Sequence, residues 1–207
     1  MRINDSLKSN FAYKLIGVFV ILLILIYILL NLPIGSLKKV WSVNTQNHIN
    51  SYQISPSGDW VAVGQADGLL FVYQQDGNVY VSYQFDDPVR KIIFSLDEKY
   101  IYVNTSIVSC FSIHEKKIIW QKFKKDFSVE DFWVYRNQEL GFVFSSKFNL
   151  NRLFTHTNSK GITTYEFSLP EMFERYHVES SDNGAFVLIC QSNGDMYAYQ
   201  NGSVLWN

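Results

Sequence analysis

The chain has 207 residues, enough for one domain, or for one domain and a tail. Apolar residues make up 47% of it and charged residues 18%, and this balance excludes a disordered chain. The net charge of −1 leaves no global basic field, so we expect no binding to nucleic acid. Two cysteines are too few for a disulfide scaffold.

A transmembrane helix is predicted over residues 15–33, after a short N-terminal tail of residues 1–14. Residues 15–32 carry no charge, and Pro33 and Gly35 end the apolar run. At 1.5 Å per residue, such a run of about 18 residues approaches the roughly 30 Å of a bilayer's hydrocarbon core. We therefore expect this segment to insert into the lipid bilayer as a single-pass anchor.

A secretory signal peptide is the alternative interpretation of this segment, but its apolar region would be shorter and a small-residue cleavage site would follow. The orientation of the span depends on the positive-inside rule. Three basic side chains precede the span and two follow it: Arg2, Lys8, Lys14, Lys38 and Lys39. This small excess favours a cytoplasmic N-terminus and an extracytoplasmic C-terminal domain, which would be periplasmic in a bacterium.

Residues 36–207 are predicted to form an all-β repeat domain. Short runs rich in Val, Ile, Tyr and Phe alternate with Ser-Gly, Asp-Gly and Asn-Gly turns. The segment that begins at Ile54 aligns without a gap with the one that begins at Phe94, 40 residues later. Similar segments follow from Tyr135 and Glu179. We assign the repeats to residues 44–85, 86–123, 124–167 and 176–207, with a hairpin insertion within 145–165 and a short helical turn over 168–175.

A second marker of the repeat is the strand that closes each unit. We align five dipeptides at this place: Val40-Trp41, Val81-Ser82, Ile119-Trp120, Thr163-Thr164 and Leu205-Trp206. A period near 40 with about four strands per unit is typical of a β-propeller blade. The fold class is therefore predicted to be a β-propeller-like repeat of about four blades, preceded by one transmembrane α-helix.

The segment from Ile54 to Tyr73 resembles a blade of the YVTN and WD-repeat-like propellers. The segments Val108–Trp120 and Asn193–Asn207 resemble the repeats of pyrroloquinoline-quinone-type, or quinoprotein-like, propellers. Tyr73-Gln74 stands where a WD repeat has Trp-Asp, which favours a bacterial-type propeller. The resemblance implies a rigid domain that presents loops to a protein partner.

The number of blades leaves three alternatives open, because rings of seven or eight blades need roughly 280–320 residues at this period. The propeller is small or open, a second chain completes it as in a homo-oligomer, or the chain is a shortened version of a longer protein.

We assign no catalytic, cofactor-binding or metal-binding residue, and we expect no cofactor. The four histidines lack a second ligand at metal spacing, and the carboxylate pairs lie in turn-like segments. Cys110 and Cys190 are expected to be buried thiols. The basic run is expected on a sheet edge, where lysines discourage edge pairing; it comprises Lys116, Lys117, Lys122, Lys124 and Lys125.

The leading hypothesis is a membrane-anchored, non-enzymatic propeller that acts as a protein-interaction or scaffold module, in an envelope complex. The alternatives are a quinoprotein-like or hydrolytic propeller enzyme and a truncated remnant of a longer propeller protein.

Overall fold

The computed structural model describes residues 40–136, 138–148, 151–169, 176–181 and 185–206, together with Ile21. The chain divides into two compact units, Met1–Val40 and Trp41–Asn207, and the fold below is that of the second. Apart from Ile21, the predicted membrane helix lies outside the described residues. In the described ranges, no helix is long and apolar enough to cross a membrane.

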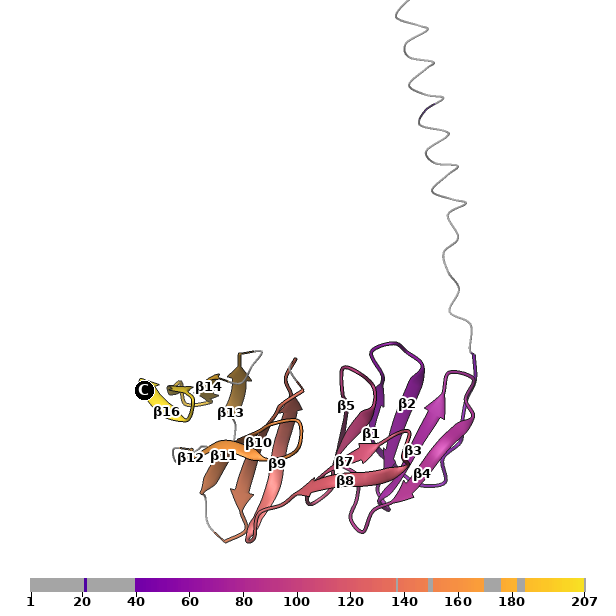
Figure 1. Ribbon diagram of the computed structural model, residues 1–207, viewed down its shortest axis with the longest axis horizontal. Coiled ribbons are helices and arrows are strands. Elements are labelled where there is room, and N and C mark those ends of the chain that lie inside the picture. The colour runs from indigo at the N-terminus through magenta and orange to yellow at the C-terminus, as the bar shows by residue number, and fades with distance from the viewer. Residues whose placement is uncertain are drawn as a thin grey trace, which may run out of the picture. The chain divides into compact units, whose positions relative to one another are not determined.

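The described part of the second unit is all β, with four sheets of four antiparallel strands each (Figure 1). We call the sheets blades 1 to 4 in chain order. Blade 1 comprises β1 (Ile49–Ile54), β2 (Trp60–Gln65), β3 (Leu69–Gln74) and β4 (Val79–Gln84). Blade 2 comprises β5 (Lys91–Phe94), β6 (Tyr100–Asn104), β7 (Val108–Ser112) and β8 (Lys117–Lys122). Blade 3 comprises β9 (Phe127–Val134), β10 (Leu140–Ser146), β11 (Arg152–Thr157) and β12 (Thr163–Ser168). Blade 4 comprises β13 (Tyr176–Ser180), β14 (Phe186–Gln191), β15 (Met196–Gln200) and β16 (Ser203–Trp206).

Each blade is a simple meander in which every strand pairs with the next one along the chain. Because side chains alternate between the two faces of a strand, each blade has two faces. We call the face toward the next blade the front face and the opposite face the back face. The fourth strand of each blade, here called the closing strand, carries a register shift against the third strand.

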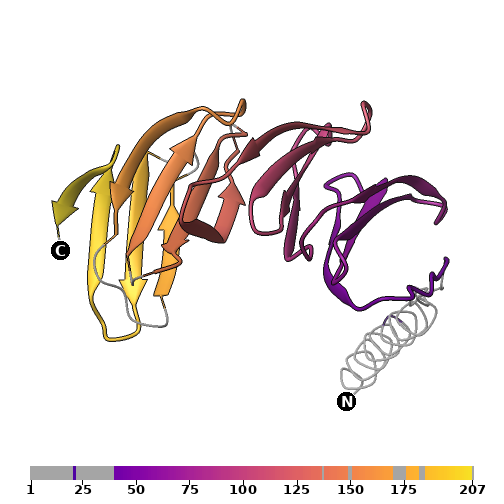
Figure 2. The same ribbon diagram turned by 90° about the horizontal axis from the view of Figure 1, so that it is seen from below.

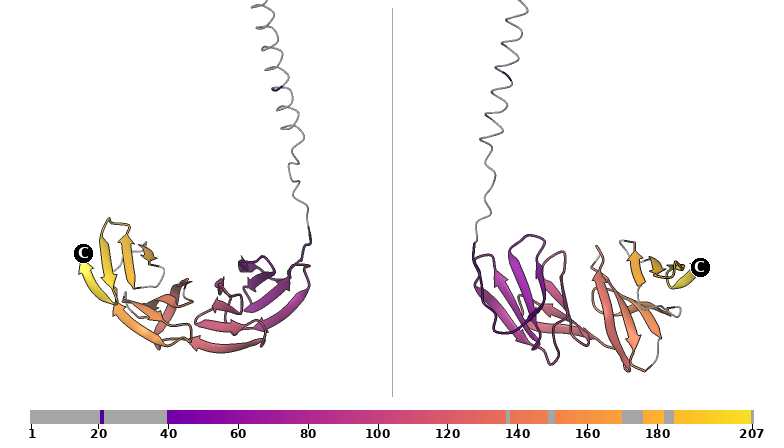
Figure 3. Two further views of the ribbon diagram at one scale, coloured as in Figure 1. Left: turned by 45° about the horizontal axis from the view of Figure 1, so that its top comes forward. Right: turned by 180° about the vertical axis from the view of Figure 1, so that it is seen from behind.

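The core lies between blades, in three separate apolar clusters. Between blades 1 and 2, front-face residues such as Ala62 and Val72 meet back-face residues such as Ile92 and Phe111. A second cluster joins blade 2 to blade 3, and a third joins blade 3 to blade 4. Figures 2 and 3 show the blades following one another in chain order, with blades 1 and 4 at opposite ends of the series.

The sheets of blades 1, 2 and 4 lie within the repeats 44–85, 86–123 and 176–207, and blade 3 extends one residue beyond the repeat 124–167, to Ser168. The hairpin insertion predicted within 145–165 corresponds to the connection between β10 and β11, residues 147–151, which is longer than residues 66–68 and 105–107 in blades 1 and 2. The strand β11 and the start of β12 occupy most of the remaining range. Polar side chains on β11, among them Thr155 and His156, are buried there and hide the strand pattern. The helical turn predicted over 168–175 begins on β12, and residues 170–175 lie outside the described part.

The clusters between blades are expected to dominate stability. Phe111 is fully buried and its ring centroid lies 5.3 Å from that of Tyr83 in the preceding blade. Replacing it by alanine should lower the free energy of unfolding by roughly 3–5 kcal/mol, because the site loses contacts on both blades. Urea titration of the full chain in mild detergent measures this.

Phe123 is the matched control, because it is 69% exposed. Phe123→Ala should change the free energy of unfolding by less than about 0.5 kcal/mol. Equal losses in the two variants would contradict a core placed between the blades.

Candidate interaction surfaces

A repeated contact joins the closing strand of one blade to a turn of the next. We call the turn between the third strand and the closing strand the outer turn. Trp120, on the closing strand of blade 2, donates its indole N–H to the carbonyl of Ser159 at 3.3 Å, on the outer turn of blade 3. Its ring lies so close to Gly161 that a Cβ there would come within 2.8 Å of the indole. Gly161 also has a φ of +76°, which glycine adopts without strain.

Trp41 makes the same contact with blade 1. Its indole donates to the carbonyl of Gln75 at 3.0 Å, and a Cβ on Gly77 would again lie 2.8 Å from the ring. Residues 40–46 belong to no strand. They therefore occupy the place of a closing strand from a preceding blade, although no such blade exists in the described chain.

The other two junctions use variants of this contact. Between blades 3 and 4, the ring of Tyr165 is the neighbour of Gly202, 3.4 Å from where its Cβ would lie. Between blades 1 and 2 the outer turn has no glycine at this place, and Lys116 lies over the ring of Tyr80 with Nζ 4.4 Å from the centroid. Each blade of the described chain thus meets an aromatic side chain from the segment before it.

The strand register corrects two of the predicted equivalences. Trp120 pairs with Cys110, and the corresponding pairs are Val81 with Val72 and Tyr165 with His156. Val81 is therefore equivalent to Trp120, whereas the predicted alignment placed it with Ile119. Tyr165 is also equivalent to Trp120, whereas the predicted alignment placed Thr164 there. All four closing strands carry the same register shift, so the shift does not cause the difference. It arises because the paired residues are nine positions apart from Val72 to Val81 and ten apart from Cys110 to Trp120.

The back face of blade 1 exposes apolar side chains at positions that are buried elsewhere. Tyr52 and Ile54 are 74% and 59% exposed. Their equivalents 40 residues later, Ile92 and Phe94, are 3% and 4% exposed because blade 1 covers them. In the part of the chain that the structure describes, no blade covers this face of blade 1.

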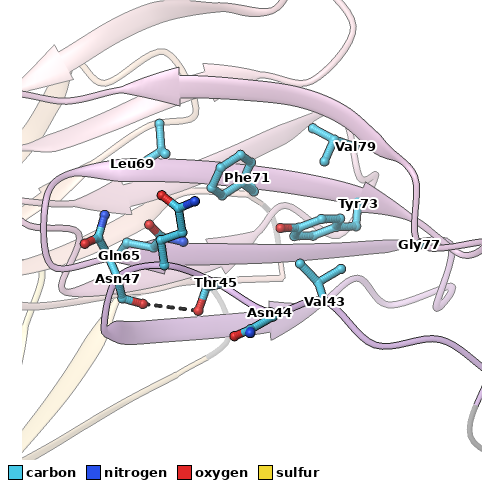
Figure 4. A pocket seen from close by; sticks show the side chains of 11 residues that line it. Val43, Asn44, Thr45, Asn47, Gln65, Leu69, Phe71, Tyr73, Gly77 and Val79 are labelled. Atoms are coloured by element: carbon cyan, nitrogen blue, oxygen red, sulfur yellow. Dashed lines mark hydrogen bonds between the residues drawn. The ribbon is translucent and has the colours of Figure 1, made fainter.

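A groove runs along the same face, with a volume of about 330 Å³. Its floor is formed by side chains of β3 and β4, including Phe71, Tyr73 and Val79, and residues 43–47 form its wall (Figure 4). Within that wall, the Thr45 hydroxyl donates to the carbonyl of Asn47 at 3.1 Å. Residues 41–47 therefore cover only part of the back face of blade 1.

Among the described residues, no blade covers the front face of blade 4 either. Met196 is 49% exposed, whereas Val108, at the equivalent place on blade 2, is fully buried against blade 3. Trp206 pairs with Ala198 as Trp120 pairs with Cys110, so it stands at the closing position of the last blade. Its side chain is 47% exposed.

The sequence analysis missed the exposure of these two faces. The alignment of Ile54 with Phe94 identifies equivalent positions in the repeat. It does not distinguish the first described blade from an internal one. The relevant signal is whether a repeat has a neighbouring repeat on both sides, because a blade with one neighbour leaves one sheet face exposed.

The described histidines form no metal-binding cluster. In the described part of the chain, no three His, Cys, Asp or Glu side chains lie close enough to hold a metal ion. His156 is the buried one. Its Nδ1 lies 2.6 Å from the Thr164 hydroxyl, and its ring stacks on Tyr165 with centroids 4.8 Å apart. Burial lowers the pKa of His156, against the opposing effect of Glu139.

The carboxylates and lysines singled out in the sequence take part mostly in contacts between blades. Lys91 Nζ on blade 2 lies 2.6 Å from the Asp131 carboxylate on blade 3. Lys124 forms an ion pair with Glu166. The predicted basic run does lie on and beside a sheet edge, because β8 is the outermost strand of blade 2.

Both cysteines are free thiols. Cys110 is buried on blade 2, and burial raises the pKa of its thiol to about 12. Cys190, on blade 4, is partly buried. The prediction of buried thiols is therefore confirmed for Cys110.

Comparisons with known proteins show the fold. No protein-family model matches the sequence, and no curated protein matches it. Among solved structures, the chain is similar to the WD40 domain of coronin from Toxoplasma gondii, with a TM-score of 0.62 and 11% identity. That match covers 78% of this chain and 45% of the coronin domain, so the chain spans less than half of that structure. It is also similar to the computationally designed Ika4 protein, with a TM-score of 0.60 and 12% identity, over 80% of this chain and 99% of the designed one. The described residues thus have a WD40-like propeller fold, and the quinoprotein-like resemblance stays a prediction.

The contact between closing strand and outer turn can be tested at Gly161. Gly161→Ala should lower the free energy of unfolding by about 2–4 kcal/mol, because a left-handed residue and an overlap with Trp120 act together. Gly194→Ala is the matched control, because Gly194 has a φ of +97° but open space around it. That variant should lose only about 1–2 kcal/mol. Urea titration compares the two, and equal losses would show that Trp120 does not pack on the turn.

Proposed function

We propose that this chain is a membrane-anchored propeller-type scaffold that binds another protein, as part of an envelope complex. The single observation that carries the proposal is the exposure of Tyr52 and Ile54 on a sheet face whose equivalent is buried in blade 2. Contact between water and an apolar sheet face of this kind is unfavourable, and covering the face with another surface lowers the free energy. A protein surface is the partner that such a face fits best.

The fold supports this proposal in a general way. A WD40-like array holds its sheets rigidly and presents loops at both ends of the strands, an arrangement compatible with a protein-interaction scaffold. Fold alone does not assign a partner, so the proposal depends on the uncovered faces.

The anchor belongs to the proposal on sequence grounds. The apolar run over residues 15–33 has the length and hydropathy of a single span. In our proposal it holds the propeller domain close to the bilayer, on the extracytoplasmic side. A tethered domain searches a thin layer beside the membrane, so it meets membrane-associated partners at a high effective concentration.

Placing two arginines in the middle of the predicted span tests the anchor. Each should cost about 2.5–3.5 kcal/mol of insertion free energy. The double variant Val20→Arg and Ile24→Arg should therefore move from the membrane fraction to the soluble fraction. The control replaces the same two residues by leucine and should stay in the membrane. If the arginine variant also sediments with membranes after a carbonate wash, this segment is not the anchor.

Photo-crosslinking from single positions tests partner binding in membranes of cells that express the full chain. A photoreactive phenylalanine analogue at Ile54 or Met196 should yield discrete adducts with protein, because both side chains lie on the uncovered faces. The control position is Phe148, which is highly exposed but lies in the loop after β10. Absence of adducts at both face positions, or equal adducts at all three, would contradict the proposal.

A further inference from the structure

In the described residues, one aromatic side chain at the place of the repeated contact, Trp206, has no outer turn to pack on. Trp41, Trp120 and Tyr165 each lie on the outer turn of the blade that follows them. Trp206 holds the same place in the register of blade 4, yet no blade follows blade 4 in the described chain. The other junctions therefore show what kind of site would bind the Trp206 indole. It is a tight turn with a left-handed glycine and a free carbonyl to accept the indole N–H.

Blade 1, at the opposite end of the series of blades, contains such an acceptor. The outer turn of blade 1 carries Gly77 with a φ of +86° and the carbonyl of Gln75. Beside it lies the uncovered back face with Tyr52 and Ile54. Blade 4 thus offers a front face and a closing-strand indole, and blade 1 offers the back face and the turn that match them. Blades 1 and 4 lie at opposite ends of the series of blades (Figures 2 and 3).

Trp41 now occupies the turn of blade 1, so the two indoles compete for one place. Residues 40–46 are not paired in a sheet, whereas β16 is paired with β15. An exchange of Trp41 for Trp206 would replace one set of indole contacts by an equivalent set. The apolar area of the two sheet faces would then be buried in addition, and this burial favours the exchange.

We propose that two copies of this chain associate head to tail, with the front face of blade 4 on the back face of blade 1 of the other copy, and with Trp206 replacing Trp41 on the Gly77 turn. This inference rests on the proposed function, because it identifies the protein that covers the two faces. Two such junctions related by a twofold axis close on themselves. The eight described blades of the two copies would then lie in one ring, a number within the range that propellers contain.

A second copy fits these faces better than an unrelated protein because both halves of the junction are present in one chain. The three internal junctions join a front face to a back face of the same repeat. The proposed junction continues that pattern, with the same closing-strand aromatic on the same kind of turn. Closure within a single copy is a different outcome, and the experiment below separates the two.

The test places the photoreactive phenylalanine analogue at Trp206 in the full chain, in mild detergent, and mixes light and heavy isotope-labelled copies in equal amounts. We expect adducts between residue 206 and the segment around Gly77, with light–heavy pairs among them. Adducts only within one copy would overturn the proposal in favour of closure within the chain. Adducts only at other segments, or none at all, would also overturn it.

Two tryptophan variants have opposite expected effects on the dissociation constant of the dimer, measured by analytical ultracentrifugation in the same detergent. Trp206→Ala should raise it about tenfold or more, because it removes the buried aromatic anchor of the junction. Trp41→Ala should lower it about tenfold, because it removes the competitor for the Gly77 turn. A structural role alone would make both variants weaken the protein in the same direction. Weaker association of both variants, or a monomer at every concentration, would overturn the proposal.

A glycine pair provides the matched control for the acceptor. In the Trp41→Ala background, where Trp206 alone would use the turn, Gly77→Ala should weaken association about tenfold or more, because its Cβ would meet the Trp206 indole. Gly58 has a similar φ of +83° with open space around it, so Gly58→Ala carries the backbone strain alone and should leave association unchanged. Equal effects of the two would contradict a turn that receives Trp206.

The outcomes also separate this inference from the proposed function. Adducts from Ile54 and Met196 to a different protein, with no light–heavy pairs, would overturn the dimer and leave the scaffold in place. Absence of adducts from every face position would overturn both.

Discussion

Each described sheet has an apolar face that a neighbouring blade covers, and the rest of the structure follows from the need to cover such faces. A single four-stranded meander cannot bury both of its faces, so each blade is stable only against its neighbours. The front face of one blade meets the back face of the next in three separate clusters. The fold is therefore a series of similar junctions, and any blade at the end of the series has one face left over.

The period of the repeat also determines which distant residues meet. Contacts between blades join side chains about one repeat apart, as in Lys91 with Asp131, Trp120 with Ser159, and Ser57 with Glu98. Their separations of 40, 39 and 41 residues match the shift that aligns Ile54 with Phe94. A contact far apart in sequence is thus local within the series of blades. Energetic coupling between neighbouring blades is expected to exceed coupling between distant ones.

Much of the fold could be predicted from the sequence because the strand signal is local. Alternating apolar side chains and tight turns identify the strands, and the gap-free match from Ile54 to Phe94 identifies the period. The alignment of closing strands was less accurate. The paired residues are nine positions apart from Val72 to Val81 but ten apart from Cys110 to Trp120, so only the pairing across strands shows which closing-strand residues are equivalent. The strand β11 was missed because its buried positions carry Thr155 and His156, which look like loop residues.

The candidate surfaces could not be predicted, because they depend on what is missing beside a blade and not on what the blade contains. Tyr52 and Ile92 have the same place in the repeat, yet one is exposed and the other is buried. Only the three-dimensional order of the blades distinguishes them.

The same reasoning applies to the segment around Trp41, which gives the described residues one more closing segment than they have blades. Four blades need four closing strands, which β4, β8, β12 and β16 provide. The segment around Trp41 is a fifth, and it lies where a blade before blade 1 would place its own. If a complete blade occupied that place, its closing strand would have to displace residues 40–46 from the outer turn of blade 1. This segment therefore covers the outer turn of blade 1, and it is held there by the Trp41 indole without sheet pairing. A closing strand that is paired in a sheet would have to displace it before any junction could form at that end.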